Sequence, residues 1–278
     1  MSTSFITITS VSNPRVKQWA QLQDRKFRNR EGRYIAEGIH LVQEALRSGA
    51  PVESVVFDQE RGLPAELTSY LKETGTEASV SASAEPIEWI AVTDAVIRKC
   101  TDAETPQSVF AVMRKPELNW RQLFEAKQAL VVVVDGVQDP GNLGTIIRSA
   151  DAVGATGVLI GRGTVDVYNS KTVRSTMGSM FHLPVVEGDL LELLPEAKQQ
   201  GVCVVSTSLQ AEHSCYSFDF RQPTWFVVGN EGKGVSPHVQ SLVDESVIIP
   251  MQGKAESLNV AMATTVLLYE AMRQRHYR

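Results

Sequence analysis

The second half of the chain alternates between apolar runs and helical patterns. The run Leu-Val-Val-Val-Val at residues 130–134 is continuous and β-branched, which is typical of a strand buried on both faces of a parallel sheet. Shorter runs at 158–160, 202–205, 225–228 and 247–249 predict further strands, and helical spacing predicts helices at 144–153 and 257–275. This alternation favours an α/β fold with a mostly parallel sheet.

The first part of the chain predicts a smaller α/β unit. Asn13 and Pro14 can start a helix, and apolar residues at helical spacing predict another helix at 38–46. Strands are expected at 54–57 and 109–113. We therefore expect a first domain at 1–113, a linker with its own short helix at 114–126, and a second domain at 127–278.

Charge is uneven along the chain. The net charge of -5 argues against wholesale electrostatic wrapping of nucleic acid. Basic residues nevertheless crowd the N-terminal segment, namely Arg15, Lys17, Arg25, Lys26, Arg28, Arg30 and Arg33, against only Asp24 and Glu31. Such a cluster can bind phosphate even on an acidic protein, and a solvated helix face explains the same charges equally well.

Cysteine and histidine usage indicates neither a disulfide framework nor a metal centre. The three cysteines, Cys100, Cys203 and Cys215, show no CxxC spacing, and no HExxH motif occurs. This pattern fits a reducing compartment. The first residues lack the basic and apolar regions of a signal peptide, and the apolar run at 131–134 is too short to span a bilayer. We expect a soluble, cytoplasmic protein with no membrane partner.

Three loops in the second half share one chemistry. They occupy residues 139–148, 229–237 and 249–260, and each combines Gly, Asn or Pro with a charged or hydroxyl residue after an apolar run. Open α/β sheets bind ligands at such strand ends. The glycines of the first two loops form neither GxGxxG nor a P-loop, which disfavours a Rossmann dehydrogenase and a P-loop NTPase.

Several loop residues have both a structural and a chemical interpretation. Asn142 lies where a helix N-cap is expected. Arg148, six residues later, can pair bidentately with a phosphate, or it can pair with an internal carboxylate such as Glu231. Ser257 can cap the last helix, whereas Asn259, just inside that helix, is less easily explained by packing.

The three loops, in this order and spacing, resemble the three motifs of the SpoU (TrmH-like) branch of the SPOUT RNA methyltransferases. The first motif is Asp139-Pro-Gly-Asn-Leu-Gly with Arg148, the second is Gly229-Asn-Glu-Gly, and the third is Ile249-Pro-Met with Ser257-Leu-Asn259. The resemblance covers about residues 130–275, including the intervening Val173-Arg-Ser-Thr-Met-Gly178 and Leu183-Pro184. Upstream, residues 31–38 and Thr105-Pro-Gln107 are similar to a small substrate-binding domain with an L30e-like fold. Ser108, Val167 and Ser170 depart from the usual family residues and leave the three motifs intact.

The resemblance implies an enzyme that transfers a methyl group from S-adenosyl-L-methionine to a ribose 2′-hydroxyl of structured RNA, with ribosomal RNA as the expected substrate. It also implies a SPOUT-type sheet with a trefoil knot and a homodimer through the knotted domain. Residues of the last helix would supply that interface or belong to the protomer's own core: Ala261, Ala263, Thr264 and Leu268. The alternatives are a catalytically inactive RNA-binding ribosome-assembly protein, a tRNA 2′-O-methyltransferase, a methyltransferase for a base or small molecule, and a small-molecule α/β enzyme.

The resemblance assigns roles to nine residues. The catalytic set is Arg148, Asn142, Glu231, Ser257 and Asn259, and the cofactor-binding set is Gly229, Ile249, Leu258 and Thr207. Arginine is effectively never deprotonated in proteins, so anchoring an RNA phosphate suits Arg148 better than general-base catalysis. Asn142, Ser257 and Asn259 would orient the ribose and Arg148, and Glu231 would fix the guanidinium or contact RNA.

Overall fold

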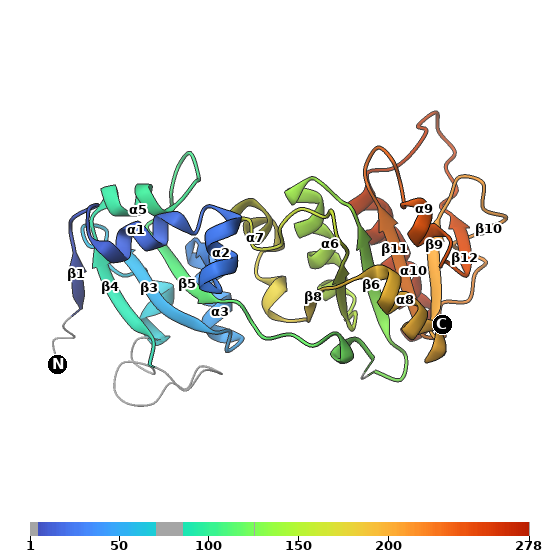
Figure 1. Cartoon of the computed structure of the whole chain (residues 1–278), viewed down its shortest axis with the longest axis horizontal. Coiled ribbons are helices and arrows are strands. Elements are labelled where there is room, and N and C mark those ends of the chain that lie inside the picture. The colour runs from blue at the N-terminus through green and yellow to red at the C-terminus, as the bar shows by residue number, and fades with distance from the viewer. Residues whose placement is uncertain (1–4, 71–85, 125, 278) are drawn as a thin grey trace. The chain divides into compact units, whose positions relative to one another are not determined.

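The computed structural model describes residues 5–70, 86–124 and 126–277, and the chain forms two compact units (Figure 1). The first comprises Met1–Glu117 together with Tyr168–Phe181, and the second comprises Leu118–Val167 together with His182–Arg278. The sequence division placed all of 127–278 in one domain. The structure instead places 168–181 with the first unit, because that segment packs into its core.

The first unit is built on a five-stranded sheet with the order β1-β4-β3-β5-β2. The strands are β1 (Ile6–Ile8), β2 (Arg33–Glu37), β3 (Val52–Asp58), β4 (Glu88–Val92) and β5 (Val109–Arg114). β5 runs antiparallel to β2 and β3, and the other pairs are parallel. Both expected strands of this region are confirmed within β3 and β5.

Helices cover both faces of this sheet. α1 (Pro14–Gln21) and α5 (Asp94–Cys100) pack on one face, through Val16, Trp19 and Ile97. α3 (Ile39–Arg47) and α7 (Ser170–Thr176) contribute to the core on the other face. The described residues of this unit also form α2 (Arg25–Glu31) and the 3-10 helices η1 (Ala65–Leu67) and η3 (Ser179–Phe181).

The predicted start of the first helix is confirmed. Asn13 caps α1 by accepting a hydrogen bond from the Arg15 N–H at 2.9 Å, and Pro14 is its first residue. Proline suits this position because its φ is helical and no N–H is needed there.

The second unit contains a seven-stranded, all-parallel sheet with the order β10-β12-β9-β11-β6-β7-β8. Its strands are β6 (Leu130–Asp135), β7 (Gly157–Ile160), β8 (Val185–Glu187), β9 (Cys203–Thr207), β10 (His213–Ser214), β11 (Thr224–Gly229) and β12 (Glu245–Ile248). Every residue of β6 is buried, as its continuous apolar run predicts. The expected α/β class with a mostly parallel sheet is therefore confirmed.

Within the described residues of this unit, four helices and one 3-10 helix flank the sheet. α8 (Leu190–Gln199), α9 (Pro237–Gln240) and η2 (Trp120–Phe124) pack against β6, β9 and β11 through one apolar cluster. α6 (Pro140–Ala152) and α10 (Val260–His276) pack on each other, and they also contact β6 and β11 respectively. The short helix expected in the linker corresponds to η2, and the trefoil knot stays a prediction.

In residues 5–70, 86–124 and 126–277, no helix is both long enough and apolar enough to cross a membrane. The same residues contain no group of three or more His, Cys, Asp or Glu side chains that could hold a metal ion.

Candidate functional site

The fold gathers the three motif loops at one edge of the second sheet. β6 and β11 are parallel neighbours, with Asp135 level with Gly229 at their carboxyl ends. β9 lies between β11 and β12. Because parallel strands end at the same edge, the loops that follow β6, β11 and β12 emerge together.

The N-cap of α6, the helix that begins within the first motif, is a different residue from the one predicted. Asp139 is the N-cap of α6, and its Oδ1 accepts a hydrogen bond from the Asn142 N–H at 2.8 Å. The assignment of Asn142 as the cap was wrong, because Pro140 is already the first helical residue. The Asn142 side chain is thereby available for contacts outside its own helix.

Glu231, in the second loop, binds the turn that precedes α6. Its Oε1 accepts hydrogen bonds from the Asp139 N–H and from Asn142 Nδ2, each at 3.0 Å. Its Oε2 accepts from the Gln138 N–H at 3.1 Å. Burial opposes ionisation of Glu231, but these hydrogen bonds outweigh it and hold the pKa of the carboxyl below its usual value. Glu231 therefore fixes the first loop.

Asn259 connects the third loop to the first. Its Oδ1 caps α10 by accepting from the N–H groups of Ala261 and Met262 at 2.9 and 3.3 Å. Its Nδ2 donates to Asn142 Oδ1 at 2.9 Å. The prediction that Ser257 caps the last helix was wrong, because α10 begins three residues later, at Val260. Glu231, Asn142 and Asn259 thus form one hydrogen-bonded chain across all three loops.

A second link between the first two loops escaped the sequence analysis. Asn230 donates from Nδ2 to the Gly136 carbonyl at 3.0 Å, and its Oδ1 accepts from the N–H groups of Gly232 and Lys233. Buried Asp135 accepts from the Ser236 N–H at 2.6 Å. An acidic residue at the end of an apolar strand was the available signal, since a buried carboxylate needs such a donor.

A cavity of about 520 Å³ lies beside this hydrogen-bonded chain. Its walls include all four residues predicted to bind a cofactor, Thr207, Gly229, Ile249 and Leu258, together with Glu231, Ser257 and Asn259. This volume is typical of small-molecule sites. Several apolar residues of the wall were not predicted to bind the cofactor, among them Leu209, Met251, Val260 and Ala263.

The cavity wall at Gly229 admits no side chain. A Cβ there would lie 2.1 Å from the Gly234 carbonyl carbon and 2.2 Å from the Val235 nitrogen. The absence of a side chain lets the backbone of the second loop fold back on β11. Leu209 and Leu258, at 63% and 41% exposure, are apolar side chains that a bound ligand would shield from water.

Arg148 is the predicted site residue that this cluster does not include. It is exposed on α6 and does not line the cavity. It forms no ion pair with any residue in the described part of the chain, and Glu231 is occupied elsewhere. The alternative of an internal Arg148–Glu231 pair is therefore wrong, and the guanidinium is open to an external anion.

Comparisons with known proteins agree with this geometry. Residues 129–269 match the SpoU rRNA Methylase family, and residues 13–111 match the MRM3-like substrate binding domain. The 23S rRNA (guanosine(2553)-2′-O)-methyltransferase RlmP of Bacillus subtilis is 38% identical over 94% of this chain and 97% of its own. The 23S rRNA (uridine(2479)-2′-O)-methyltransferase of Streptomyces viridochromogenes is 35% identical over 95% and 91%.

Solved structures show the same likeness. The SpoU methyltransferase AviRb of Streptomyces viridochromogenes, in complex with AdoMet, has a TM-score of 0.83 and 34% identity over 95% of this chain and 98% of its own. The AdoMet-bound rRNA methyltransferase of Sinorhizobium meliloti has a TM-score of 0.83 and 31% identity over 96% and 97%. With its three motif loops joined beside one cavity, this chain belongs to the SpoU rRNA methylase family.

Proposed function

We propose that this chain transfers the methyl group of S-adenosyl-L-methionine to a ribose 2′-hydroxyl of 23S ribosomal RNA. The main support for this function is the chain of hydrogen bonds from Glu231 through Asn142 to Asn259, which joins the three motif loops beside the cavity. Both relatives described above are named for 2′-O-methylation of 23S rRNA, one at a guanosine and one at a uridine. The proposed substrate implies a cytoplasmic protein.

The cavity fits S-adenosyl-L-methionine in size and in lining. Gly229, Ile249 and Leu258 would hold the adenosyl group through backbone N–H and C=O groups, and Leu209 and Met251 would supply apolar surface. When bound, the cofactor supplies an electrophilic methyl group on a sulfonium sulfur. The chain's own part is to hold a ribose oxygen in line with that methyl group, so positioning carries much of the rate.

The reaction would form a bond from the ribose O2′ to the methyl carbon and break the carbon–sulfur bond, whose electron pair stays on sulfur in S-adenosyl-L-homocysteine, while the hydroxyl proton passes to solvent water. Arg148 binds an RNA phosphate, which places positive charge near the developing negative charge on O2′. Ser257 is exposed at the cavity, and its hydroxyl has no hydrogen-bond partner among the described residues. We assign it to the RNA substrate.

The roles of Asn142 and Asn259 differ from the initial interpretation. We first expected these side chains to orient the ribose and Arg148. Asn259 already uses its oxygen to cap α10 and a nitrogen hydrogen to bind Asn142, which in turn binds Glu231. We therefore propose that both residues hold the three loops in register, and that the substrate is bound by Arg148 and Ser257.

We propose that basic residues near the N-terminus of the first unit bind the RNA, but that Arg28 is not one of them. Arg25 and Lys26 are exposed on α2 and can contact phosphates. Arg28 is only 3% exposed, and its Nη1 donates to the carbonyls of Leu22 and Gln23 at 2.8 Å each. Arg28 therefore stabilises the turn between α1 and α2.

We further propose a homodimer formed through α10, on a different face from the one first considered. Ala261, Thr264 and Leu268 are at most 1% exposed and belong to the protomer's own core. Met262 and Tyr269 are 54% and 47% exposed and lie seven residues apart on one side of the helix. Sedimentation velocity tests this proposal, because a Met262→Glu, Tyr269→Glu double variant should then sediment as a monomer.

The decisive experiment is a map of 2′-O-methylated nucleotides in RNA from cells with and without the gene. The proposal is supported if one nucleotide of 23S rRNA lacks its 2′-O-methyl group in cells without the gene. The wild-type gene should restore that methyl group, and the gene for the Arg148→Ala variant should not. Loss of a tRNA methylation instead, or an unchanged map, would contradict the proposal.

A further inference from the structure

The segment Tyr168–Phe181 lies in the sequence of the second unit but is built into the core of the first. Its flanks, up to Val167 and from His182, belong to the second unit. Val173 is fully buried in an apolar cluster with residues of β2, α3 and β3, and Tyr168, Met180 and Phe181 pack against the same cluster. The first unit therefore completes its core with residues contributed from the methyltransferase part of the sequence.

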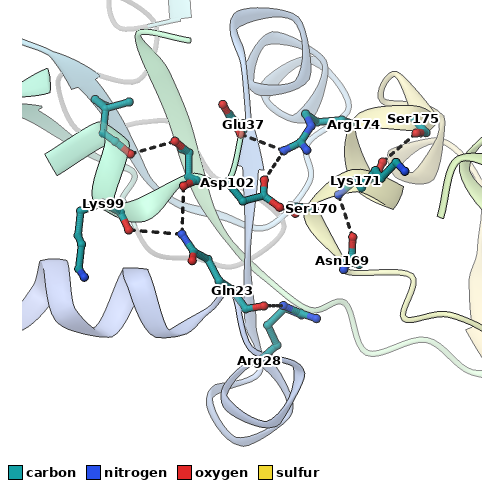
Figure 2. A network of polar contacts seen from close by, with 12 residues as sticks. Gln23, Arg28, Glu37, Lys99, Asp102, Asn169, Ser170, Lys171, Arg174 and Ser175 are labelled. Atoms are coloured by element: carbon teal, nitrogen blue, oxygen red, sulfur yellow. Dashed lines mark hydrogen bonds and ion pairs between the residues drawn. The ribbon is translucent and has the colours of Figure 1, made fainter. Parts of the chain in front are cut away.

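An ion-pair network fixes this segment from its polar side (Figure 2). Arg174 Nη1 donates to Glu37 Oε2 at 3.0 Å and to Asp102 Oδ1 at 2.6 Å. The Ser170 hydroxyl donates to the other carboxylate oxygen of Asp102. α7 is thus bound at once to the end of β2 and to the loop that follows α5.

Arg174 is important here because Glu37 is buried. The Glu37 side chain is 4% exposed. Burial raises the pKa of its carboxyl, and the nearby Arg174 guanidinium opposes that rise. Removing Arg174 would leave a buried carboxylate without its charged partner, which is strongly unfavourable.

The carboxyl end of α7 also fits closely against α3. Gly178 has a φ of +95°, and a Cβ there would lie 2.6 Å from Glu44 Cγ. Met177, in the left-handed region with a φ of 52°, has its carbonyl oxygen 3.1 Å from His40 Nε2. At the other end, the Tyr168 ring lies 4.7 Å from that of Tyr34.

Three sequence stretches that did not enter the proposed chemistry meet at this point. They are residues 31–38, Thr105-Pro-Gln107 and residues 173–178. Gln107 Oε1 accepts a hydrogen bond from the Ile39 N–H at 3.0 Å, and the Gln107 side chain lies directly against Gly38. None of these residues lines the cavity of the second unit. Gln107 therefore holds the turn after β2, and Glu37 beside that turn binds Arg174 of α7.

We propose that Arg174 is a positioning residue that couples RNA capture by the first unit to methyl transfer by the second. With Tyr168–Phe181 docked, the chain passes between the units three times, after Glu117, after Val167 and after Phe181. If Tyr168–Phe181 leaves the core of the first unit, only the connection after Glu117 still joins the two units. A looser tether lowers the effective concentration of captured RNA at the methyltransferase site. The inference rests on the proposed function.

The experiment compares wild type with Arg174→Met, Arg174→Lys and, as a matched control, Arg98→Met. Arg98 is another arginine of the first unit that pairs with a carboxylate, Asp94, at 2.6 Å, and it is 58% exposed. Methyl transfer is measured on 23S rRNA isolated from cells lacking the gene. S-Adenosyl-L-methionine binding is measured by calorimetry, and hydrogen exchange of residues 168–181 is followed by mass spectrometry.

Arg174→Met should accelerate exchange in 168–181 by on the order of tenfold while leaving β6, β9 and β11 protected. It should raise the KM for RNA about fivefold or more, with kcat at saturating RNA and cofactor affinity little changed. Arg174→Lys should lie in between, and Arg98→Met should match wild type.

Three results would overturn the proposal. Unchanged exchange in 168–181 would mean that Arg174 does not hold the segment. Faster exchange with an unchanged KM for RNA would mean that docking does not serve RNA capture. Joint loss of kcat and cofactor binding would mean that Arg174 supports the methyltransferase site itself and does not act by positioning captured RNA. Absence of methylation by the wild-type protein would instead refute the proposed function, so the two failures are distinguishable.

Discussion

Asn259 Nδ2 donates a hydrogen bond to Asn142 Oδ1 across 2.9 Å, although 117 residues separate the two in the chain. Asn259 uses its other amide atom to cap α10, and Asn142 uses its own nitrogen to bind Glu231. Each amide is therefore held in one orientation, because a flipped amide would place two oxygens or two N–H groups face to face. The start of α10 is tied through this link to the start of α6.

Replacing Asn259 by aspartate separates its two roles. Asn259→Asp keeps an oxygen that caps α10 but removes the donor to Asn142, whereas Asn259→Ala removes both. We expect Asn259→Ala to lower the free energy of unfolding by about 1 kcal/mol and Asn259→Asp to leave it nearly unchanged, while both variants lose most methyl transfer. Denaturant unfolding and a turnover assay check this. Wild-type turnover in Asn259→Asp would show that the link is dispensable.

Glu231→Gln tests the electrostatics of the same chain. The folded-state pKa of Glu231 lies below its unfolded value. Its carboxylate therefore stabilises the fold above the unfolded pKa of about 4.3, and this contribution is lost as pH falls through the lower folded value. Glu231→Gln should consequently have a lower Tm than wild type at pH 7, and the difference should narrow in acid.

Glu256→Gln is the control for that measurement. Glu256 is an exposed carboxylate with no hydrogen bond to the residues described by the structure, so its loss should leave the dependence of Tm on pH unchanged. If the Tm difference between wild type and Glu231→Gln is as large at low pH as at pH 7, the shape of the Glu231 side chain matters for stability and its charge does not.

The sequence predicted the second sheet well because its signals are local. A continuous β-branched run such as 130–134 describes a strand by itself, and Asn13-Pro14 describes a helix start by itself. The packing of α7 in the first unit and the Glu231–Asn142 hydrogen bond depend on contacts between segments about 90 or more residues apart. The burial of Arg28 depends on the packing of the turn between α1 and α2. Residue periodicity does not encode these features.

The helix caps illustrate the same limit on a smaller scale. Asn142 and Ser257 are residue types that favour N-caps, yet Asp139 and Asn259 occupy those positions. Cap propensities of Asn, Asp and Ser are nearly equal. The cap position is set by where each helix begins, which is at Pro140 for α6 and at Val260 for α10.

Gly229→Ala should abolish cofactor binding. An added Cβ would meet backbone atoms of Gly234 and Val235 at 2.1 to 2.3 Å, and backbone cannot move aside as a flexible side chain can. We expect a loss of about 3 kcal/mol in unfolding free energy and no detectable calorimetric signal with S-adenosyl-L-methionine. Gly253→Ala is the control, because its Cβ would meet nothing within 4 Å and Gly253 does not line the cavity. Cofactor binding by Gly229→Ala would contradict the assigned cavity wall.

Charge reversal on α2 tests RNA capture. Arg25→Glu with Lys26→Glu should weaken RNA binding strongly at low salt and less at high salt, because the lost contacts are to phosphates. The fold should be retained, since both side chains are exposed. Filter binding across a salt series measures this effect. The double reversal Arg98→Glu with Lys99→Glu changes the charge by the same amount at two other exposed residues of this unit and should leave RNA binding unchanged. An unchanged salt slope in the α2 variant would exclude α2 as the RNA-binding surface.

Arg148 provides the sharpest test of the proposed chemistry. It is exposed and forms no ion pair with any residue in 5–70, 86–124 or 126–277, so removing it should cost the fold little. Arg148→Ala should therefore bind S-adenosyl-L-methionine with wild-type affinity and unfold at the wild-type Tm, yet methylate RNA at least about a hundredfold more slowly. Arg148→Lys keeps the charge and loses the bidentate geometry, so partial activity is expected if the role is to bind a phosphate. Near-normal turnover of Arg148→Ala would remove Arg148 from the mechanism, whereas loss of cofactor binding would place it in the cavity wall.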